Sequence, residues 1–203
     1  MIDTDPALPP GEESARRKRV IRAAEELFKR VGFRAVTMEA VARDANVAKG
    51  TLYGYFKNKD ELYTAVCARL ARLLRQAVEH ALAQPQVPLD IRLADAVIAK
   101  HRMVFTYVRG SAHAAELYSY KDAMAGGIFA ELDAAILGLL TQAMEADARL
   151  SPNAKRLASA LYLASADLAG RSNTAAEMEN EIRFFVNVHL AGARALAAKE
   201  KRS

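Results

Sequence analysis

The stretch TMEAVARDANVAKGTLYGYFKNKD, residues 37–60 of the 203-residue chain, sets the architecture of its N-terminal part. Its apolar spacing predicts two short helices joined by a sharp turn. The hydroxyl of Thr37 is placed to cap the first helix, and Asn46 lies at the turn, where asparagine tolerates positive φ better than most residues. The inward side chains are expected to be Met38, Val41, Ala42, Ala45, Val47, Leu52 and Phe56. This pattern is typical of a helix–turn–helix.

The outer side of the second helix carries residue types that contact DNA. Lys49 can donate to guanine N7 and O6 or to a phosphate, and Gly50 lets the backbone approach a duplex closely. Four further side chains can reach phosphates or a thymine methyl group: Thr51, Tyr53, Tyr55 and Lys59. A short helix of this kind fits the major groove, so the stretch predicts binding to double-stranded DNA.

The charge of the chain is unevenly distributed. Residues 16–59 hold 12 Lys and Arg residues against 4 Asp and Glu residues, a net charge of +8. The whole chain carries +5, so the remainder sums to −3. A basic N-terminal part joined to a mildly acidic remainder is expected of a protein whose one end meets a polyanion, although charge alone would equally fit a solvated basic surface.

With these residues in place, the chain resembles the tetracycline-repressor (TetR) family of transcription regulators over about residues 17–63. The resemblance rests on Phe28, Gly32-Phe33, Thr37, Val41-Ala42 and the run ANVAKGTLYGYFKNKDEL at 45–62. It implies an all-helical homodimer with a small N-terminal DNA-binding domain and a larger effector-binding and dimerising domain. It also implies that seven positions touch DNA: Thr37, Lys49, Gly50, Thr51, Tyr53, Tyr55 and Lys59.

Two positions depart from the family pattern. Asn46 stands where most relatives have glycine, a mild change because asparagine also accepts positive φ. Ala48 stands where most have serine or threonine, so the second helix lacks the usual side-chain cap at its start.

The remaining sequence predicts further helices and no strands. Residues 1–14 contain three prolines, a glycine and four acids, which favours a disordered lead-in. A first helix ends at Gly32, and a long helix from Asp60 to about residue 83 could run from the DNA-binding part into the rest of the chain. We therefore expect three parts: a lead-in at 1–14, a helix–turn–helix domain at 15–60, and a helical effector-binding and dimerisation domain at 61–203.

The last helix, at about 175–198, has two apolar faces rather than one. The first is Met178, Ile182, Phe185, Val186, Ala193 and Leu196, and the second is Phe184, Val188, Ala191 and Ala195. A helix with two apolar faces needs two partners, and the second partner is expected to be the same surface of another copy. The alternative is a helix buried on both sides within one chain.

Seven residues are candidates for lining an effector site: His101, Phe105, Tyr107, His113, Tyr118, Met124 and Phe129. His101 lies on an otherwise apolar helical face, where it could reach into a ligand cavity. It could equally be a core histidine bonded to a backbone carbonyl, which is the more common arrangement. Aromatic residues and methionine at helical spacing also more often form plain core.

Several other functions find little support in the residues. The four histidines have no spacing that pairs two metal ligands on one helix, and the single cysteine, Cys67, is expected to face the core. Neither a catalytic acid–base pair nor a cofactor motif is present, so we expect no enzyme activity, no cofactor and no bound metal. The chain has no run of 18 uninterrupted apolar residues, so we expect no membrane span. A cytoplasmic location is expected.

These observations predict a sequence-specific dimeric regulator of transcription that binds a near-palindromic operator. A repressor released by a small-molecule effector is the favoured form. The alternative is an effector-independent regulator whose dimer core is solid, and a helical enzyme is the least supported reading.

Overall fold

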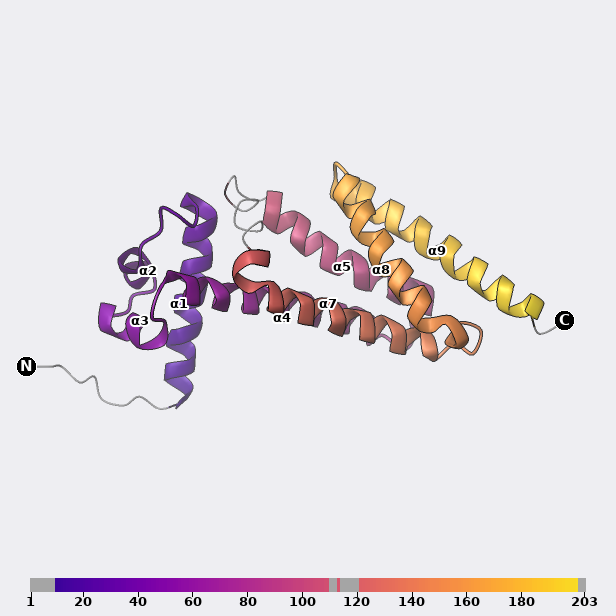
Figure 1. Ribbon diagram of the computed structural model, residues 1–203, viewed down its shortest axis with the longest axis horizontal. Coiled ribbons are helices and arrows are strands. Elements are labelled where there is room, and N and C mark those ends of the chain that lie inside the picture. Colours follow the sequence, from indigo (N-terminus) through magenta and orange to yellow (C-terminus); the bar gives the residue numbers. More distant parts are fainter. Residues whose placement is uncertain (1–9, 110–112, 114–120, 201–203) are drawn as a thin grey trace, which may run out of the picture. The chain divides into compact units, whose positions relative to one another are not determined.

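The computed structural model describes residues 10–109, 113 and 121–200, and every regular element among them is helical. The all-α architecture expected from the sequence is therefore confirmed. The elements, shown in Figure 1, are α1 (Pro10–Val31), α2 (Met38–Asp44), α3 (Lys49–Tyr55), α4 (Lys59–Leu82), α5 (Leu89–Arg109), α7 (Lys121–Glu145), a 3-10 turn η1 (Ser151–Asn153), α8 (Ala154–Arg171) and α9 (Ala175–Glu200).

The described residues fall into two compact units. The first unit contains residues 10–69, with 109, 113 and 121–126, and the second contains 70–108 with 127–200. The division runs through α4, α5 and α7, so each of these helices contributes residues to both units.

The first unit is built around an aromatic cluster that joins α1, the loop after it and α4. The ring centroids of Phe28 and Phe33 lie 5.4 Å apart, those of Phe33 and Tyr63 lie 5.3 Å apart, and those of Phe28 and Tyr63 lie 6.1 Å apart. Tilted and edge-on pairs at these separations are favourable beyond the area that they bury. The cluster fixes the end of α1 against the start of α4.

Helix α1 ends where the sequence predicts and begins earlier. Gly32 adopts φ +83° and donates its N–H to the Phe28 carbonyl at 3.0 Å, which confirms the left-handed stop. The start at Pro10 overlaps the stretch for which a disordered lead-in was expected. Residues 10–14 have a physical reason to be helical, because proline is accepted at the first helical position and acidic residue types are favoured in the first turn of a helix. Residues 1–9 lie outside the described part of the chain.

A partly buried ion pair also connects α1 and α4 within the first unit. Arg69 Nη1 lies 2.6 Å from Glu25 Oε2. Burial raises the pKa of Glu25, and the charge of Arg69 opposes that rise. Removing Arg69 would leave the buried carboxylate of Glu25 without compensation, so the position of Glu25 depends on Arg69.

The second unit has its core between α5, α7, α8 and α9. Val97, Ile136, Leu161 and Ile182, one from each helix, are fully buried. Residues 125–145 are long and apolar enough by length and composition to cross a membrane, but Ile136, Leu140 and Met144 on this helix are buried inside the unit. One face of α7 therefore packs in the core of the second unit, although only 28% of its apolar window is buried. Its backbone leaves helical geometry at Ala125 (φ −144°, ψ 23°), directly before Gly126 and Gly127.

One arginine connects three parts of the second unit. Arg194 on α9 donates to both carboxylate oxygens of Asp90 on α5, at 2.6 and 2.8 Å, and its Nε donates to Asp147 Oδ2 at 2.9 Å. Hydrogen bonding to Asp90 raises the pKa of Arg194 despite partial burial. Burial works to raise the pKa of Asp147, but the backbone N–H of Arg149 and the guanidinium of Arg194 outweigh it and lower that pKa.

The turn before α8 differs from the expected helix start. Serine and proline at 151 and 152 are residue types that often start an α-helix, whereas here they open the 3-10 turn η1. The chain bends there because Ser151 donates its N–H to the Asp147 carbonyl at 2.9 Å. Helix α8 then starts at Ala154, without a side-chain cap from Asn153.

The two apolar faces of α9 are present, with one exchange of residues. Met178, Ile182 and Val186 are buried, and Phe184 (69% exposed) and Val188 (57%) lie on the open side. Leu196, expected on the inner face, is 64% exposed, and Leu190 is buried instead. Residues 182, 186 and 190 are spaced by four, so the inward stripe follows this row and leaves position 196 outside.

Candidate nucleic-acid interface

The turn between α2 and α3 has the geometry of a helix–turn–helix. Thr37 is extended (φ −109°, ψ 154°), and its Oγ1 accepts the N–H of Ala40 at 3.2 Å, which caps α2. Asn46 takes φ 51° and is the only residue other than glycine with positive φ in the described part of the chain. The chain then returns through the N–H of Val47, which donates to the Ala42 carbonyl at 3.0 Å. Both local expectations, the cap and the turn, are confirmed.

The inner side of helix α3 is anchored by buried side chains, and its outer side is open. Leu52 is fully buried, and Phe56, which follows the helix, is nearly so. Ala48 stands at the N-cap position in an extended conformation and makes no side-chain cap, as expected from its methyl group. A Cβ added at Gly50 or Gly54 would meet no atom within 4 Å, so both glycines border open space. The outer side of α3 is free for close approach by a ligand.

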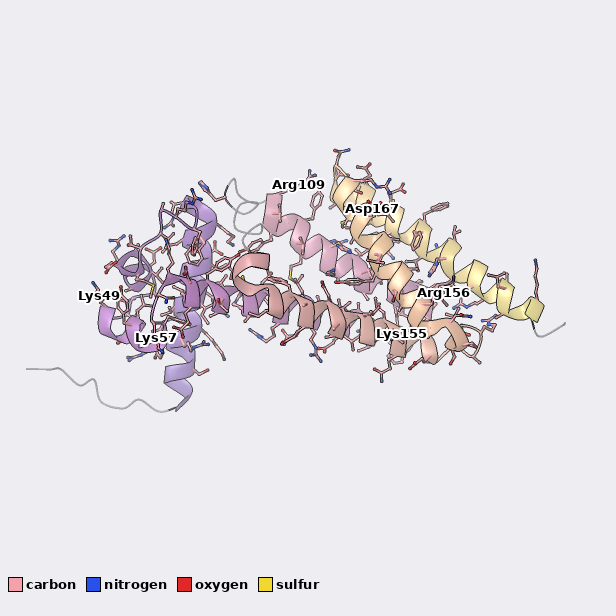
Figure 2. All side chains as sticks on the ribbon, in the orientation of Figure 1. Lys49, Lys57, Arg109, Lys155, Arg156 and Asp167 are labelled. Carbon is pink, nitrogen blue, oxygen red and sulfur yellow. The ribbon has the colours of Figure 1, made fainter. Side chains whose placement is uncertain are left out.

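The cation at the start of α3 is paired across the turn. Lys49 Nζ lies 2.6 Å from Glu39 Oε1 on α2, and both side chains are exposed. The hydrogen bond to Glu39 raises the pKa of Lys49, and the same bond lowers the pKa of Glu39. Lys49 stays positively charged at neutral pH. In Figure 2 it lies at the outer edge of its unit.

The two tyrosines of α3 differ in exposure. Tyr53 is 40% exposed, with Lys49 Nζ 5.8 Å from its ring centroid. Tyr55 is half-buried, and its ring packs edge-on against Phe56 with the centroids 6.5 Å apart. Thr51 is also half-buried. Tyr53 and Lys49 therefore form the more accessible part of the predicted DNA-binding set.

Lys59 makes hydrogen bonds within its own unit that the sequence did not predict. Its ammonium donates to the carbonyls of Phe33, Arg34 and Val36, at 2.8, 3.2 and 3.1 Å. It also lies 4.5 Å from the centroid of the Phe33 ring. The loop between α1 and α2 makes no helix, so its carbonyls need partners, and Lys59 supplies them. Its role in touching DNA stays a prediction.

Two residues near this surface were missed by sequence reasoning. Glu39 could have been noticed as the one acid near the start of the first helix, but nothing in the sequence places it opposite Lys49. Arg17 lies over the ring of Phe56 at 4.9 Å, which brings the basic stretch of α1 beside the end of α3. The only sequence signal for Arg17 was the local surplus of positive charge.

The candidate effector residues are divided between the units. His101, Phe105, Tyr107 and Phe129 belong to the second unit, and His113 belongs to the first, beside Gly32. Tyr118 lies outside the described residues, and Met124 is described only as part of helix α7. Their role as one effector site stays a prediction.

His101 is engaged within the core of the second unit. Its Nε2 lies 3.0 Å from Ser165 Oγ, which in turn donates to the Tyr162 carbonyl at 2.9 Å. Burial, together with the positive charge of Lys100, lowers the pKa of His101 to about 3. The ring is therefore neutral at physiological pH, and Nε2–H is the donor to Ser165. This bond resembles the core alternative, with a hydroxyl in place of the expected carbonyl.

Two pockets lined by described residues lie near the start of α8 in the second unit. One, of about 310 Å³, lies between α8 and α9 and is bordered by Arg149, Arg156 and His189 among others. The second surrounds η1 and the start of α8. Neither includes any of the seven candidate effector residues. Within the described part of the chain, no cluster of three or more His, Cys, Asp or Glu could hold a metal ion.

Comparison with known proteins identifies the first unit. Residues 20–66 match the sequence profile of the family "Bacterial regulatory proteins, tetR family". An HTH-type transcriptional regulator of uncharacterised role from Bacillus subtilis, YhgD, is 37% identical over 84 residues, 41% of this chain and 44% of that protein. The transcriptional repressor KstR from Rhodococcus jostii is 46% identical over 57 residues, 28% of this chain and 27% of the repressor. The chain thus matches less than half the length of these relatives.

Solved structures extend the likeness to the whole fold. A chain from Mesorhizobium loti described as TetR-family superposes with a TM-score of 0.71 at 17% identity, covering 88% of this chain and 96% of that one. A TetR-like transcriptional regulator from Rhodococcus sp. RHA1 superposes with a TM-score of 0.61 at 24% identity, covering 92% of this chain and 100% of that one. These identities support a shared fold and nothing finer.

Replacing Ala48 by serine is expected to stabilise the protein. A serine hydroxyl at the N-cap can accept a backbone N–H of α3, a contact worth about 0.5–2 kcal/mol. We expect a higher Tm in thermal unfolding followed by circular dichroism. Ala48→Val, which adds volume without an acceptor, is the matched control, and an equal rise in both variants would contradict the capping argument.

Replacing Lys59 by methionine is expected to destabilise the first unit. Methionine keeps the length of the side chain but leaves three carbonyls without their charged donor, and hydrogen bonds to charged groups contribute about 1.5–3 kcal/mol each at most. Urea unfolding should show a loss of about 1–3 kcal/mol. Lys57→Met, at an exposed position two residues away, is the control and should lie close to the wild type.

Proposed function

This chain belongs to the tetR family of bacterial regulatory proteins. On that premise, we propose that it is a sequence-specific DNA-binding regulator that represses transcription. The observation that carries the proposal is the open outer side of α3. It combines a fixed cation, an exposed tyrosine and two glycines bordered by free space. An enzyme activity is not part of the proposal, and a cytoplasmic location follows from a chromosomal target.

The proposed DNA contacts come from the start of α2 and from α3. Lys49, Gly50 and Tyr53 would approach the major groove, with Thr51 and Tyr55 at its edges. Thr37 and Lys59 would lie beside the phosphates, Lys59 in addition to its loop contacts. Arg17 on α1 and the exposed Lys57 add positive charge on the same unit. Phosphate contacts give affinity, and contacts to base edges give sequence preference.

The proposed assembly is a homodimer through α8 and α9. Regulators of the tetR family bind DNA operators and act as dimers. Leu163 (70% exposed) on α8 and Phe184, Val188 and Leu196 on α9 are exposed apolar side chains, and we call these four residues the α8–α9 face. Its charges also suit a second copy, because Arg156 lies near the start of α8 and Asp167 near its end (Figure 2). Twofold pairing with α8 antiparallel would bring the two charges together.

Such a dimer would bind a near-palindromic operator. Two copies of α3 related by a twofold axis would read half-sites about 34–36 Å apart, one turn of B-DNA. A change in the distance between the two copies would weaken binding. The helices α4, α5 and α7 each have residues in both units, so they are candidates for carrying such a change.

The proposed control signal is a small molecule bound in the second unit, near His101, Phe105 and Tyr107 on α5. An effector acts only through its different affinity for the two states. The alternative is an effector-independent regulator, and the core bond from His101 to Ser165 favours it at that position. Screening small molecules for release of bound DNA separates the two, since an effector-independent regulator would be released by none.

Removing the two accessible side chains of α3 should weaken specific binding. For Lys49→Ala combined with Tyr53→Ala, we expect an affinity loss of about 10- to 100-fold for a duplex selected from a random pool. Fluorescence anisotropy measures the Kd. The control is Arg75→Ala, which removes an exposed cation from α4. Wild-type affinity in the double variant would refute the assignment of the DNA surface.

A charge on the α8–α9 face should separate the dimer. Val188→Glu places a carboxylate among exposed apolar side chains, whose burial against a second copy would then require its desolvation. Sedimentation analysis should show a monomer, with DNA affinity reduced. Ile91→Glu alters a similarly exposed apolar residue on α5 and should leave the dimer intact. A dimeric Val188→Glu protein would place the interface elsewhere.

A further inference from the structure

We infer that Glu39 is a specificity-determining residue that positions the Lys49 ammonium for one acceptor on DNA and limits its contacts with phosphates elsewhere. This inference rests on the proposed function and concerns a residue that makes no predicted contact with DNA itself. It follows from the geometry of the helix–turn–helix and from the different demands of specific and non-specific binding.

The pair bridges the two helices of the motif. Glu39 lies in the first turn of α2, and Lys49 is the first residue of α3. Their charged atoms are 2.6 Å apart, and no other ion pair of Lys49 is recorded among the described residues. A lysine side chain has four rotatable bonds, so without this carboxylate the ammonium could sweep a wide arc.

The helix dipoles affect the two charges in opposite ways. An acid in the first turn of α2 is favoured by the helix dipole, whereas a cation at the first position of α3 is disfavoured. The carboxylate of Glu39 therefore offsets the cost of Lys49 where α3 also lacks a side-chain cap. The centroid of the Tyr53 ring lies 5.8 Å from the ammonium.

The pair leaves the ammonium able to bind DNA. An ammonium group has three donors, and Glu39 uses one of them. The other two can serve guanine N7 and O6 if the base lies where the fixed ammonium points. The pair is exposed, and exposed ion pairs are weak, so the protein folds with or without it.

The pair keeps Lys49 available for a specific base, but it disfavours non-specific binding. Non-specific affinity comes almost wholly from cations that neutralise phosphates along any sequence. A carboxylate beside Lys49 cancels part of its charge and repels the phosphates around it. Glu39 thus lowers the affinity for DNA in general while keeping Lys49 aligned for a correct base.

The experiment compares two duplexes and five proteins, one of which is a control variant. One duplex is selected from a random pool with the wild-type protein, and the other is a scrambled duplex of equal length and composition. The proteins are the wild type, Glu39→Gln, Lys49→Met and the double variant. Glu26→Gln is the matched control, because it removes one negative charge from an exposed pair of similar length, Lys29–Glu26 at 2.5 Å, in the same unit.

We expect Glu39→Gln to bind the scrambled duplex about two- to fivefold more tightly, while affinity for the selected duplex stays equal or falls. The ratio of the two affinities therefore decreases. The released lysine adds one phosphate contact, so the slope of log affinity against log salt on the scrambled duplex steepens by up to about 0.9. The Tm should stay close to that of the wild type. Glu26→Gln should keep the affinity ratio.

The Lys49→Met background isolates the pair. If Glu39 acts through Lys49, Glu39→Gln changes the affinity ratio in the wild type and leaves it unchanged beside methionine. The inference is overturned if the ratio is unaffected by Glu39→Gln, if it falls equally in both backgrounds, or if Glu26→Gln lowers it as much. Failure of the proposed function has a different signature: the wild-type protein would enrich no sequence and would bind both duplexes equally.

Discussion

The three hydrogen bonds from Lys59 to the loop after α1 are the constraint on which the DNA-binding unit depends. A loop without helical hydrogen bonds is defined only if its polar groups find partners, and here one ammonium supplies them from the start of α4. The aromatic cluster of Phe28, Phe33 and Tyr63 holds the same segment from its apolar side. Thr37 follows directly, so the cap of α2, the turn and the direction of α3 inherit their positions from this loop.

The architecture was readable from the sequence wherever a local rule governs the backbone. Gly32, Thr37 and Asn46 each adopt the conformation that their chemistry predicts, and Ala48 fails to cap as a methyl group must. Periodicity likewise identified Leu52 and Phe56 as the inward anchors of α3. These inferences need only the neighbouring residues, and so they survive without knowledge of the fold.

The rest depends on contacts between distant parts of the chain. The partners of Lys59 are 23 to 26 positions away, and nothing in the spacing shows where a flexible four-carbon side chain will reach. The exchange of Leu190 for Leu196 has the same origin, because both lie on apolar rows of α9 and only packing against the other helices selects one. His101 was correctly placed in the interior, while its bond to Ser165, 64 positions away, was beyond prediction. Counting charges identified the basic part of the chain, but it could not show that Glu39 pairs with Lys49 there.

The composition of α3 has a kinetic consequence. Seven residues include two glycines, each costing about 1 kcal/mol of helix stability relative to alanine, and the helix has no side-chain cap. Leu52 is its one buried residue, so α3 keeps its shape through that anchor and Phe56 rather than through its own hydrogen bonds. Its amide protons should therefore exchange with solvent far sooner than those of α1 or α4. A duplex bound to α3 would slow that exchange. Helix α3, which contacts the bases in the proposed complex, would then be the last part of the protein to become rigid.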